Sequence, residues 1–173
     1  GRQEDAQLLV ALAGGVLAFL GFNLRTPWRK RAAIFMGDAG SMCLGFAIAY
    51  FAIKLTQGEG TRASPVTALW LLALPLMDTI SVMVRRIIKG RNPFAADREH
   101  LHHIFLLADF TPAATAAILI VASALLAAAG VVGWYIGVPE PIMFLAFLAL
   151  FVAYSTVMQH AWKVMRALKK DAG

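Results

Sequence analysis

The sequence contains almost no cysteine and few charged residues. Its single cysteine, Cys43, has no partner in the chain, which excludes an intrachain disulfide and a cysteine metal cluster. Charged residues make up 15% of the 173 residues, against roughly 25% in an ordinary soluble domain, while 60% are hydrophobic. One small core cannot bury that much apolar surface. The composition therefore predicts that part of the chain faces lipid.

The basic residues lie between apolar runs. The net charge is +6 at pH 7, with a pI near 9.9. In a soluble protein this balance would suggest nucleic acid, but cations beside apolar runs are typical of membrane orientation signals and of contacts with phosphate head groups. We therefore expect a membrane and not nucleic acid as the partner of this charge.

Five apolar segments have the length of membrane spans. A bilayer core about 30 Å thick requires about 20 apolar helical residues. The segments are roughly residues 6–24, 36–55, 65–84, 113–136 and 141–161. Ser64 and Thr111 each stand before a proline, which places a capping hydroxyl ahead of a proline at the first helical position. The sequence predicts an all-α, polytopic helical bundle with five transmembrane helices, forming one membrane domain over residues 1–173.

Lysine and arginine are unevenly divided between the two sides of this arrangement. If successive spans cross the membrane in opposite directions, 13 of the 16 Lys and Arg residues fall on one side, after the first, third and fifth spans. Only Arg2, Lys54 and Arg62 fall on the other side. Cytoplasmic loops are enriched in positive charge, so we expect the N-terminus outside and the C-terminus in the cytoplasm. The connection of about residues 85–112 is then a long cytoplasmic loop, and it is the expected functional face.

The first candidate for chemistry is Asp38, which enters the second span between Gly37 and Gly40. A carboxylate at membrane depth normally has a partner or a wet cavity, and flanking glycines allow close approach of a ligand. Mg²⁺ fits this setting because it takes carboxylate oxygens and bridges diphosphate. The alternative is a helix-start acid that complements the helix dipole and pairs with Arg31.

The second candidate is the histidine segment of residues 97–103 on the long loop. Asp97 could cap a short helix, one turn of which would place His100 and His103 on one face, with His102 offset by about 100° per residue. The pair could ligate a transition metal, but the arginines and lysines of the same loop favour a phosphate site. A basic loop that only touches anionic lipid is the remaining alternative.

Asp78 is a third acid, about two turns inside the membrane from Arg85. A buried acid at that depth requires a partner. It could shape an active-site cavity or form an interhelical contact, and the sequence leaves both open.

Taken together, these segments resemble the polyprenyl-phosphate N-acetylhexosamine-1-phosphate transferases, a glycosyltransferase 4 family, over about residues 20–170. The matching segments occur in family order. They are Phe35-Met36-Gly37-Asp38-Ala39-Gly40-Ser41, Ser64-Pro65-Val66-Thr67-Ala68-Leu69-Trp70, Pro75-Leu76-Met77-Asp78, Arg85-Arg86 and Asp97-Arg98-Glu99-His100-Leu101-His102-His103. Leu101 interrupts the histidines, as in the branch of the family that uses simple UDP-N-acetylhexosamines, which favours UDP-GlcNAc.

The resemblance implies transfer of a sugar 1-phosphate from a UDP-amino sugar to a polyprenyl phosphate such as undecaprenyl phosphate, with release of UMP. It implies Mg²⁺ or Mn²⁺ held by Asp38, and an enzyme of the bacterial inner membrane that initiates cell-envelope polysaccharide synthesis, lipopolysaccharide included. The catalytic residues it implies are Asp38, His100, His102 and His103. The substrate-binding residues are Gly37, Ser41, Arg85, Arg86 and Arg98. The oligomeric state is left open, with a homodimer as one candidate.

The chain also departs from the family pattern. The paired-aspartate motif and the asparagine- and aspartate-rich motif of the family belong to its N-terminal half, and neither occurs here. We therefore expect the chain to be the C-terminal part of a larger transferase and to be inactive alone. A transport module, or a membrane-anchoring module with a basic lipid-binding cytoplasmic face, is the non-enzymatic alternative.

Overall fold

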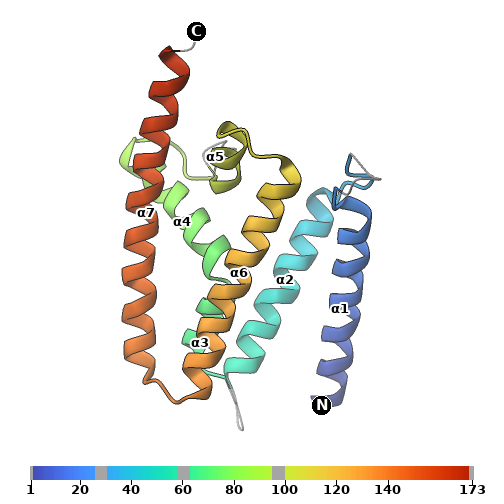
Figure 1. The fold of residues 1–173 in the computed structure, drawn as a ribbon. Coiled ribbons are helices and arrows are strands. Elements are labelled where there is room, and N and C mark those ends of the chain that lie inside the picture. The colour runs from blue at the N-terminus through green and yellow to red at the C-terminus, as the bar shows by residue number, and fades with distance from the viewer. Residues whose placement is uncertain (1, 26–30, 58–62, 95–99, 172–173) are drawn as a thin grey trace. The chain divides into compact units, whose positions relative to one another are not determined.

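Helices are the regular elements throughout the part of the chain that the structure describes. The computed structural model describes residues 2–25, 31–57, 63–94 and 100–171. In chain order the helices are α1 (Arg2–Asn23), α2 (Gly37–Thr56), α3 (Pro65–Leu71), α4 (Ala73–Ile88), α5 (Leu101–Leu107), α6 (Pro112–Tyr135) and α7 (Glu140–Asp171) (Figure 1). The predicted all-α class is confirmed.

Four helices are long and apolar enough to cross a membrane. The candidate spans are Gln3–Asn23, Gly37–Thr56, Pro112–Tyr135 and Glu140–Lys163. They coincide with four of the five predicted segments, with boundaries that differ by a few residues. The chain is a multi-pass membrane protein.

The third predicted span is helical but broken. α3 and α4 meet at Leu72 with a bend of 81°, and together they count as one further span or as a re-entrant loop. Pro75 lies in the first turn of α4 and has no N–H to donate to the carbonyl of Leu71, so one unbroken helix would leave that carbonyl without its helical partner. The expectation of a single helix over residues 65–84 is corrected on this point.

The predicted starts of two helices are confirmed. The hydroxyl of Ser64 accepts from the backbone N–H of Val66 at 3.2 Å, and the hydroxyl of Thr111 accepts from that of Ala114 at 3.2 Å. A proline at the first helical position follows each cap. These contacts satisfy backbone donors that a helix start leaves without intrahelical partners.

The chain divides into two compact units, Gly1–Ala47 and Ile48–Gly173. In the first unit, α1 and the segment before α2 are joined by two hydrogen bonds. The N–H of Ala33 donates to the backbone oxygen of Phe22 at 3.3 Å, and that of Ile34 donates to Oδ1 of Asn23 at 3.0 Å.

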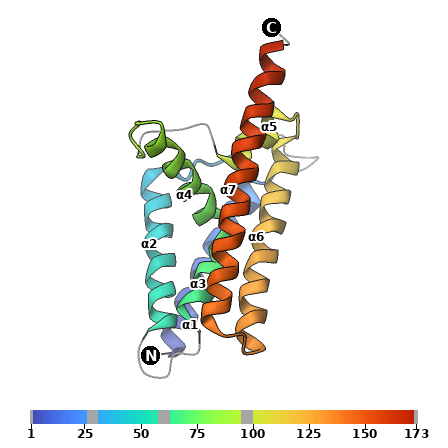
Figure 2. The same cartoon turned by 90° about the vertical axis from the view of Figure 1, so that its left-hand side faces the viewer.

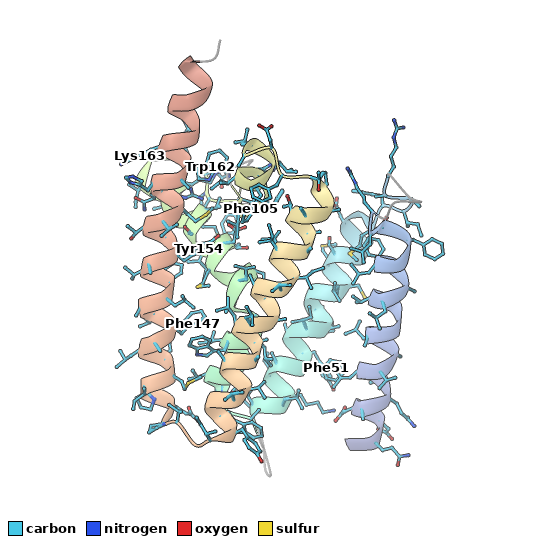
Figure 3. The ribbon with its side chains drawn as sticks, viewed as in Figure 1. Phe51, Phe105, Phe147, Tyr154, Trp162 and Lys163 are labelled. Atoms are coloured by element: carbon cyan, nitrogen blue, oxygen red, sulfur yellow. The ribbon has the colours of Figure 1, made fainter. Side chains whose placement is uncertain are left out.

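In the second unit, α3 packs against α6, and both α4 and α5 contact α6 and α7. α6 and α7 run antiparallel and lie side by side in both views (Figures 1 and 2). The buried core lies where α3 and α4 meet α7, and it consists of Trp70, Ala73, Met77 and Phe147. Phe147 and Tyr154 project from α7 toward the broken α3–α4 segment (Figure 3).

Candidate active site

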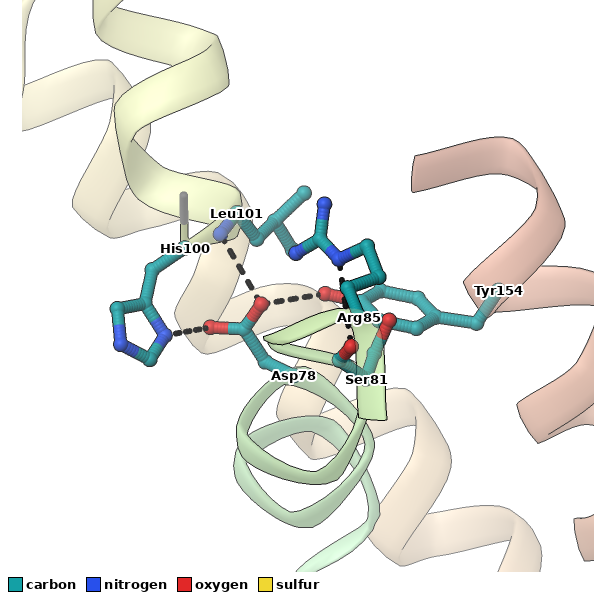
Figure 4. A network of polar contacts seen from close by, with 6 residues as sticks. All are labelled: Asp78, Ser81, Arg85, His100, Leu101 and Tyr154. Atoms are coloured by element: carbon teal, nitrogen blue, oxygen red, sulfur yellow. Dashed lines mark hydrogen bonds and ion pairs between the residues drawn. The ribbon is translucent and has the colours of Figure 1, made fainter. Parts of the chain in front are cut away.

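Asp78 lies at the centre of a polar network that joins three helices of the second unit. Its Oδ2 is 2.9 Å from Nδ1 of His100, and its Oδ1 accepts from the backbone N–H of Leu101 at 3.1 Å and from the hydroxyl of Tyr154 at 2.8 Å (Figure 4). Asp78 is on α4, His100 and Leu101 begin α5, and Tyr154 is on α7. The side chain of Asp78 is 16% exposed. The interhelical contact that was one of its two predicted roles is therefore present.

The three histidines gather at the start of α5. α5 begins at Leu101 with His100 in the N-cap position, whereas the predicted cap, Asp97, lies outside the described residues. The rings of His100 and His102 are stacked with centroids 5.9 Å apart, and those of His102 and His103 are 4.1 Å apart. His102 thus has a ring contact with each of the other two histidines.

This crowding changes the proton affinity of His102. Its pKa is lowered from its ordinary value of 6.5, first by burial and then by the neighbouring charges of His103 and His100, while Asp78 opposes the shift. His102 is consequently neutral at pH 7 and can accept as well as donate a hydrogen bond.

The two predicted phosphate-binding arginines lie in the last turn of α4, not in the loop that follows it. Arg85 is 6% exposed and donates its Nε–H to the backbone oxygen of Ser81 at 3.2 Å. Arg86 donates from Nη1 to the backbone oxygen of Asn92 at 3.0 Å, which ties down the turn after α4. Their binding of substrate stays a prediction, and Arg98 lies outside the described residues.

A small basic pocket opens beside Arg85, between α4 and α7. Its volume is about 150 Å³. It is lined by Arg85, Ile88, Lys89, Gln159, Trp162 and Lys163. Three cations around one cavity suit an anion.

Asp38 belongs to the first unit, in the first turn of α2. Gly37 has φ +69°, a left-handed conformation that a side chain would strain, and this turn presents Asp38 at the helix start. The Ser41 hydroxyl donates to the backbone oxygen of Asp38 at 3.0 Å. Within residues 31–57, no ion pair joins Asp38 to Arg31, but the place of Asp38 in the first turn of α2 agrees with the other part of the structural alternative, an acid that complements the helix dipole.

The carboxylate of Asp38 fits a hard cation. It is exposed, and among the described residues it has neither a hydrogen-bond nor an ion-pair partner. Mg²⁺ commonly takes one or two carboxylates and completes its coordination with water and substrate phosphates, so one accessible carboxylate is a sufficient protein contribution. Among the described residues, no three His, Cys, Asp or Glu side chains are arranged to hold a metal ion.

The structure thus brings Asp78, His100, His102 and His103 together and adds Tyr154, which the sequence analysis did not single out. Tyr154 lies in an apolar run of α7 among residues that resemble packing positions. One tyrosine hydroxyl in a membrane helix is a weak signal of a polar role.

Comparison with known proteins supports the family resemblance. Residues 1–56 match the sequence model of Glycosyl transferase family 4. The chain is 42% identical over 171 residues to the undecaprenyl-phosphate alpha-N-acetylglucosaminyl 1-phosphate transferase of Escherichia coli (strain K12), which covers 98% of this chain and 46% of that protein. The enzyme of the same name from Haemophilus influenzae is 37% identical over 170 residues, covering 98% of this chain and 48% of that protein.

The chain spans about half the length of the curated relatives it matches. No solved structure matches it. The chain is thus similar over nearly its whole length to the undecaprenyl-phosphate alpha-N-acetylglucosaminyl 1-phosphate transferases, and its first 56 residues match Glycosyl transferase family 4.

Proposed function

We propose that this protein, at full length, transfers N-acetylglucosamine 1-phosphate from UDP-GlcNAc to undecaprenyl phosphate and releases UMP. The observation that carries the proposal is the 42% identity, over 98% of this chain, to a relative named for that transfer. The cluster of His100, His102, His103 and Asp78 supports it, because such a cluster suits a reaction between phosphate groups.

The reaction requires no covalent chemistry from the protein. An oxygen of the lipid phosphate attacks the phosphorus that carries the sugar, and a new phosphorus–oxygen bond forms. The bond between that phosphorus and the bridging oxygen of UMP breaks, and UMP leaves with the electron pair. Catalysis of such a step consists mainly of positioning the phosphates and neutralising their developing charge.

The residues of this chain divide those tasks. Asp38 would hold Mg²⁺ or Mn²⁺, which supplies charge neutralisation for the diphosphate when it is bound. His102 is neutral at pH 7 and can donate a hydrogen bond to a phosphate oxygen from one ring nitrogen. Arg86 and the cations near it offer permanent positive charge that a departing phosphate group requires.

The location proposed for this reaction is the cytoplasmic side of the bacterial plasma membrane. Of the 16 Lys and Arg residues, 13 fall on one predicted side of the membrane and three on the other. This supports the location, because cytoplasmic loops are enriched in Lys and Arg. In this orientation the connection between α4 and α6, which carries the histidines, faces the compartment where UDP-sugars are made. The product would then supply cell-envelope polysaccharide synthesis.

A transport function is less well supported by the network around Asp78. An acid on an ion pathway must exchange its partner with the passing ion. The carboxylate of Asp78 instead receives the Leu101 N–H and the Tyr154 hydroxyl and contacts His100, all within 3.1 Å. A membrane-anchoring module would use the cations but leave the histidines and Asp38 without a role.

The proposal is tested by following both labels of the donor. Membranes that contain the full-length protein receive undecaprenyl phosphate, Mg²⁺ and UDP-GlcNAc labelled either in the sugar or in the sugar-linked phosphate. We expect both labels to enter the lipid fraction, and Asp38→Asn to abolish both. Asp109→Asn is the matched control, because Asp109 is an exposed acid with φ 61°, a conformation that asparagine tolerates.

Each outcome separates the alternatives. Sugar label without phosphate label would contradict phosphosugar transfer. Transfer only from another UDP-sugar would retain the reaction class and change the sugar. If no UDP-sugar labels the lipid while the protein is inserted in the membrane, the transferase proposal is wrong and the anchoring function is favoured.

A further inference from the structure

Asp78 has no direct part in the proposed reaction, but its contacts indicate a supporting role. The following inference rests on the proposed function, because it concerns how the histidine segment is held for that reaction. Asp78 is on α4, and its three partners come from the start of α5 and from the middle of α7 (Figure 4). One carboxylate thus connects three elements that are far apart in the sequence.

The first consequence concerns which nitrogen of His100 carries a proton. The N–H of Leu101 can only donate, and an ionised carboxylate can only accept. The carboxylate oxygen 2.9 Å from Nδ1 of His100 therefore selects the form in which Nδ1 carries the proton. The second ring nitrogen, Nε2, faces away from Asp78 (Figure 4). In the neutral ring this nitrogen has the free lone pair.

The second consequence concerns the position of α5. His100 occupies the N-cap position of this short helix, and its side chain forms no capping hydrogen bond. Oδ1 of Asp78 accepts from Leu101 N–H, one of the donors that a helix start leaves without a partner. An acceptor on α4 thereby fixes where the histidine segment begins.

Tyr154 fixes Asp78 in turn. Its hydroxyl donates to the same Oδ1 at 2.8 Å, and its ring packs against the core of Trp70, Ala73, Met77 and Phe147. Met77, the neighbour of Asp78 in the sequence, is only 2% exposed. The carboxylate is therefore held from both α4 and α7, and its orientation depends on packed side chains.

We propose that Asp78 and Tyr154 are positioning residues: they hold His100 with Nδ1–H directed at Asp78 and with Nε2 available to the phosphate groups of the proposed reaction. Neither residue has to touch substrate. Carboxylates that orient a histidine in this way fix both its tautomer and the direction of its free nitrogen.

The proposal predicts opposite behaviour of two conservative substitutions. In Asp78→Asn the amide oxygen can still accept from Leu101 and Tyr154, but its NH₂ group then faces Nδ1 of His100 and favours the tautomer protonated at Nε2. Asp78→Glu retains the carboxylate and therefore the original tautomer. Tyr154→Phe removes one donor and leaves the carboxylate in place, so the tautomer is retained in a less firmly held ring.

The direct test is the ¹⁵N spectrum of the imidazole nitrogens in the full-length protein, labelled in histidine and purified in detergent. His100→Gln identifies the signals of His100. We expect Nδ1 to be protonated and Nε2 not in the parent and in Asp78→Glu, and the reverse in Asp78→Asn. This readout does not depend on transferase activity.

The second test is steady-state kinetics of the same variants across a range of pH. We expect Asp78→Asn to lower kcat by about ten- to a hundredfold and to change the pH profile, with a much smaller effect on KM for the UDP-sugar. Asp78→Glu and Tyr154→Phe should lose less. The matched controls are Asp109→Asn and Tyr135→Phe, since both residues are exposed and lie outside the network.

The outcomes distinguish this inference from the proposed function. An unchanged tautomer in Asp78→Asn, or a reversed tautomer with unchanged kcat, would overturn the inference while transferase activity in the parent stands. If the tautomer reverses in Asp78→Asn as expected but the parent protein transfers no sugar phosphate, the proposed function is overturned and, with it, the catalytic part of the inference. Detergent-stable, monodisperse protein in every variant excludes misfolding as the cause of lost activity.

Discussion

Trp70 donates its indole N–H to the backbone oxygen of Met143, 3.1 Å away and 73 residues later in the chain. The Trp70 ring also meets Phe147 edge to face, with centroids 6.0 Å apart. These contacts join α3 to α7 next to the break at Leu72. The packing of Trp70 on α7 therefore helps to hold the bend between α3 and α4.

Substitution of Gly130 by alanine should destabilise the protein. A Cβ on Gly130 would overlap the Cβ of Trp70, whose position is tied to its backbone, and α3 packs directly on α6 at this point. Overpacking of this kind costs about 1–3 kcal/mol, which exceeds the helix-propensity gain of about 1 kcal/mol. The matched control is Gly45→Ala, because a Cβ there meets nothing within 4 Å. Thermal unfolding in detergent should show a lower midpoint for Gly130→Ala only, and equal midpoints would contradict the close packing.

Trp70→Phe tests the hydrogen bond to Met143. The substitution keeps an aromatic ring against Phe147 but leaves the carbonyl of Met143 without this donor in a half-buried site. The Met143 carbonyl lies inside α7, where the helix supplies it with a second donor, so the substitution removes one hydrogen bond and leaves no unsatisfied group. Loss of one such bond costs about 0.5–1.5 kcal/mol, and the unfolding midpoint should fall accordingly. Trp134→Phe changes an exposed tryptophan and should have little effect. If both variants unfold alike, the bond between α3 and α7 contributes nothing measurable.

The lowered pKa of His102 predicts a loss of stability on mild acidification. The unfolded chain binds a proton at His102 as the pH falls through 6.5, whereas the folded protein resists that proton until a lower pH. The unfolded state thus binds more protons in this window, and the free energy of unfolding declines until the folded pKa is passed. His102→Gln lacks this contribution. Its unfolding midpoint should therefore fall less than that of the parent between pH 7.5 and pH 5.5, and equal declines would contradict the prediction.

Removal of divalent metal should abolish transfer and leave the membrane fold intact. Asp38 is an exposed carboxylate that can serve as a Mg²⁺ ligand, and no described helix contact depends on it. Chelation should stop labelling of the lipid, and added Mg²⁺ or Mn²⁺ should restore it. Asp38→Glu should raise the Mg²⁺ concentration needed for half-maximal activity, because a longer side chain alters the geometry that this small ion requires. An unaltered Mg²⁺ requirement would place the metal on other residues.

Much of the fold could be predicted from the sequence because membrane spans are encoded locally. The lengths of the apolar runs predicted the four continuous spans, and Ser64 and Thr111 predicted two helix starts that the structure confirms. The bend between α3 and α4 could not be read in the same way. Pro75 is compatible with a helix start or with a kink, and the packing of Trp70 on α6 and α7 selects between them.

The candidate site was predicted in part. The histidine segment was recognised from its residue types and from a family resemblance, and Asp78 was recognised as an acid that requires a partner. Tyr154 was not recognised, since a tyrosine among apolar residues resembles an ordinary packing position. The convergence of Asp38 with the histidines stays a prediction.

The sequence by itself determined the helical class, the membrane location and the family resemblance, because apolar run length, capping pairs and motif order are local properties of the chain. The tertiary structure alone decided which partners Asp78 has. His100 lies 22 residues from Asp78 and Tyr154 lies 76 residues away. Contacts over such separations depend on how α4, α5 and α7 pack, and on the desolvation that obliges a half-buried carboxylate to find donors there.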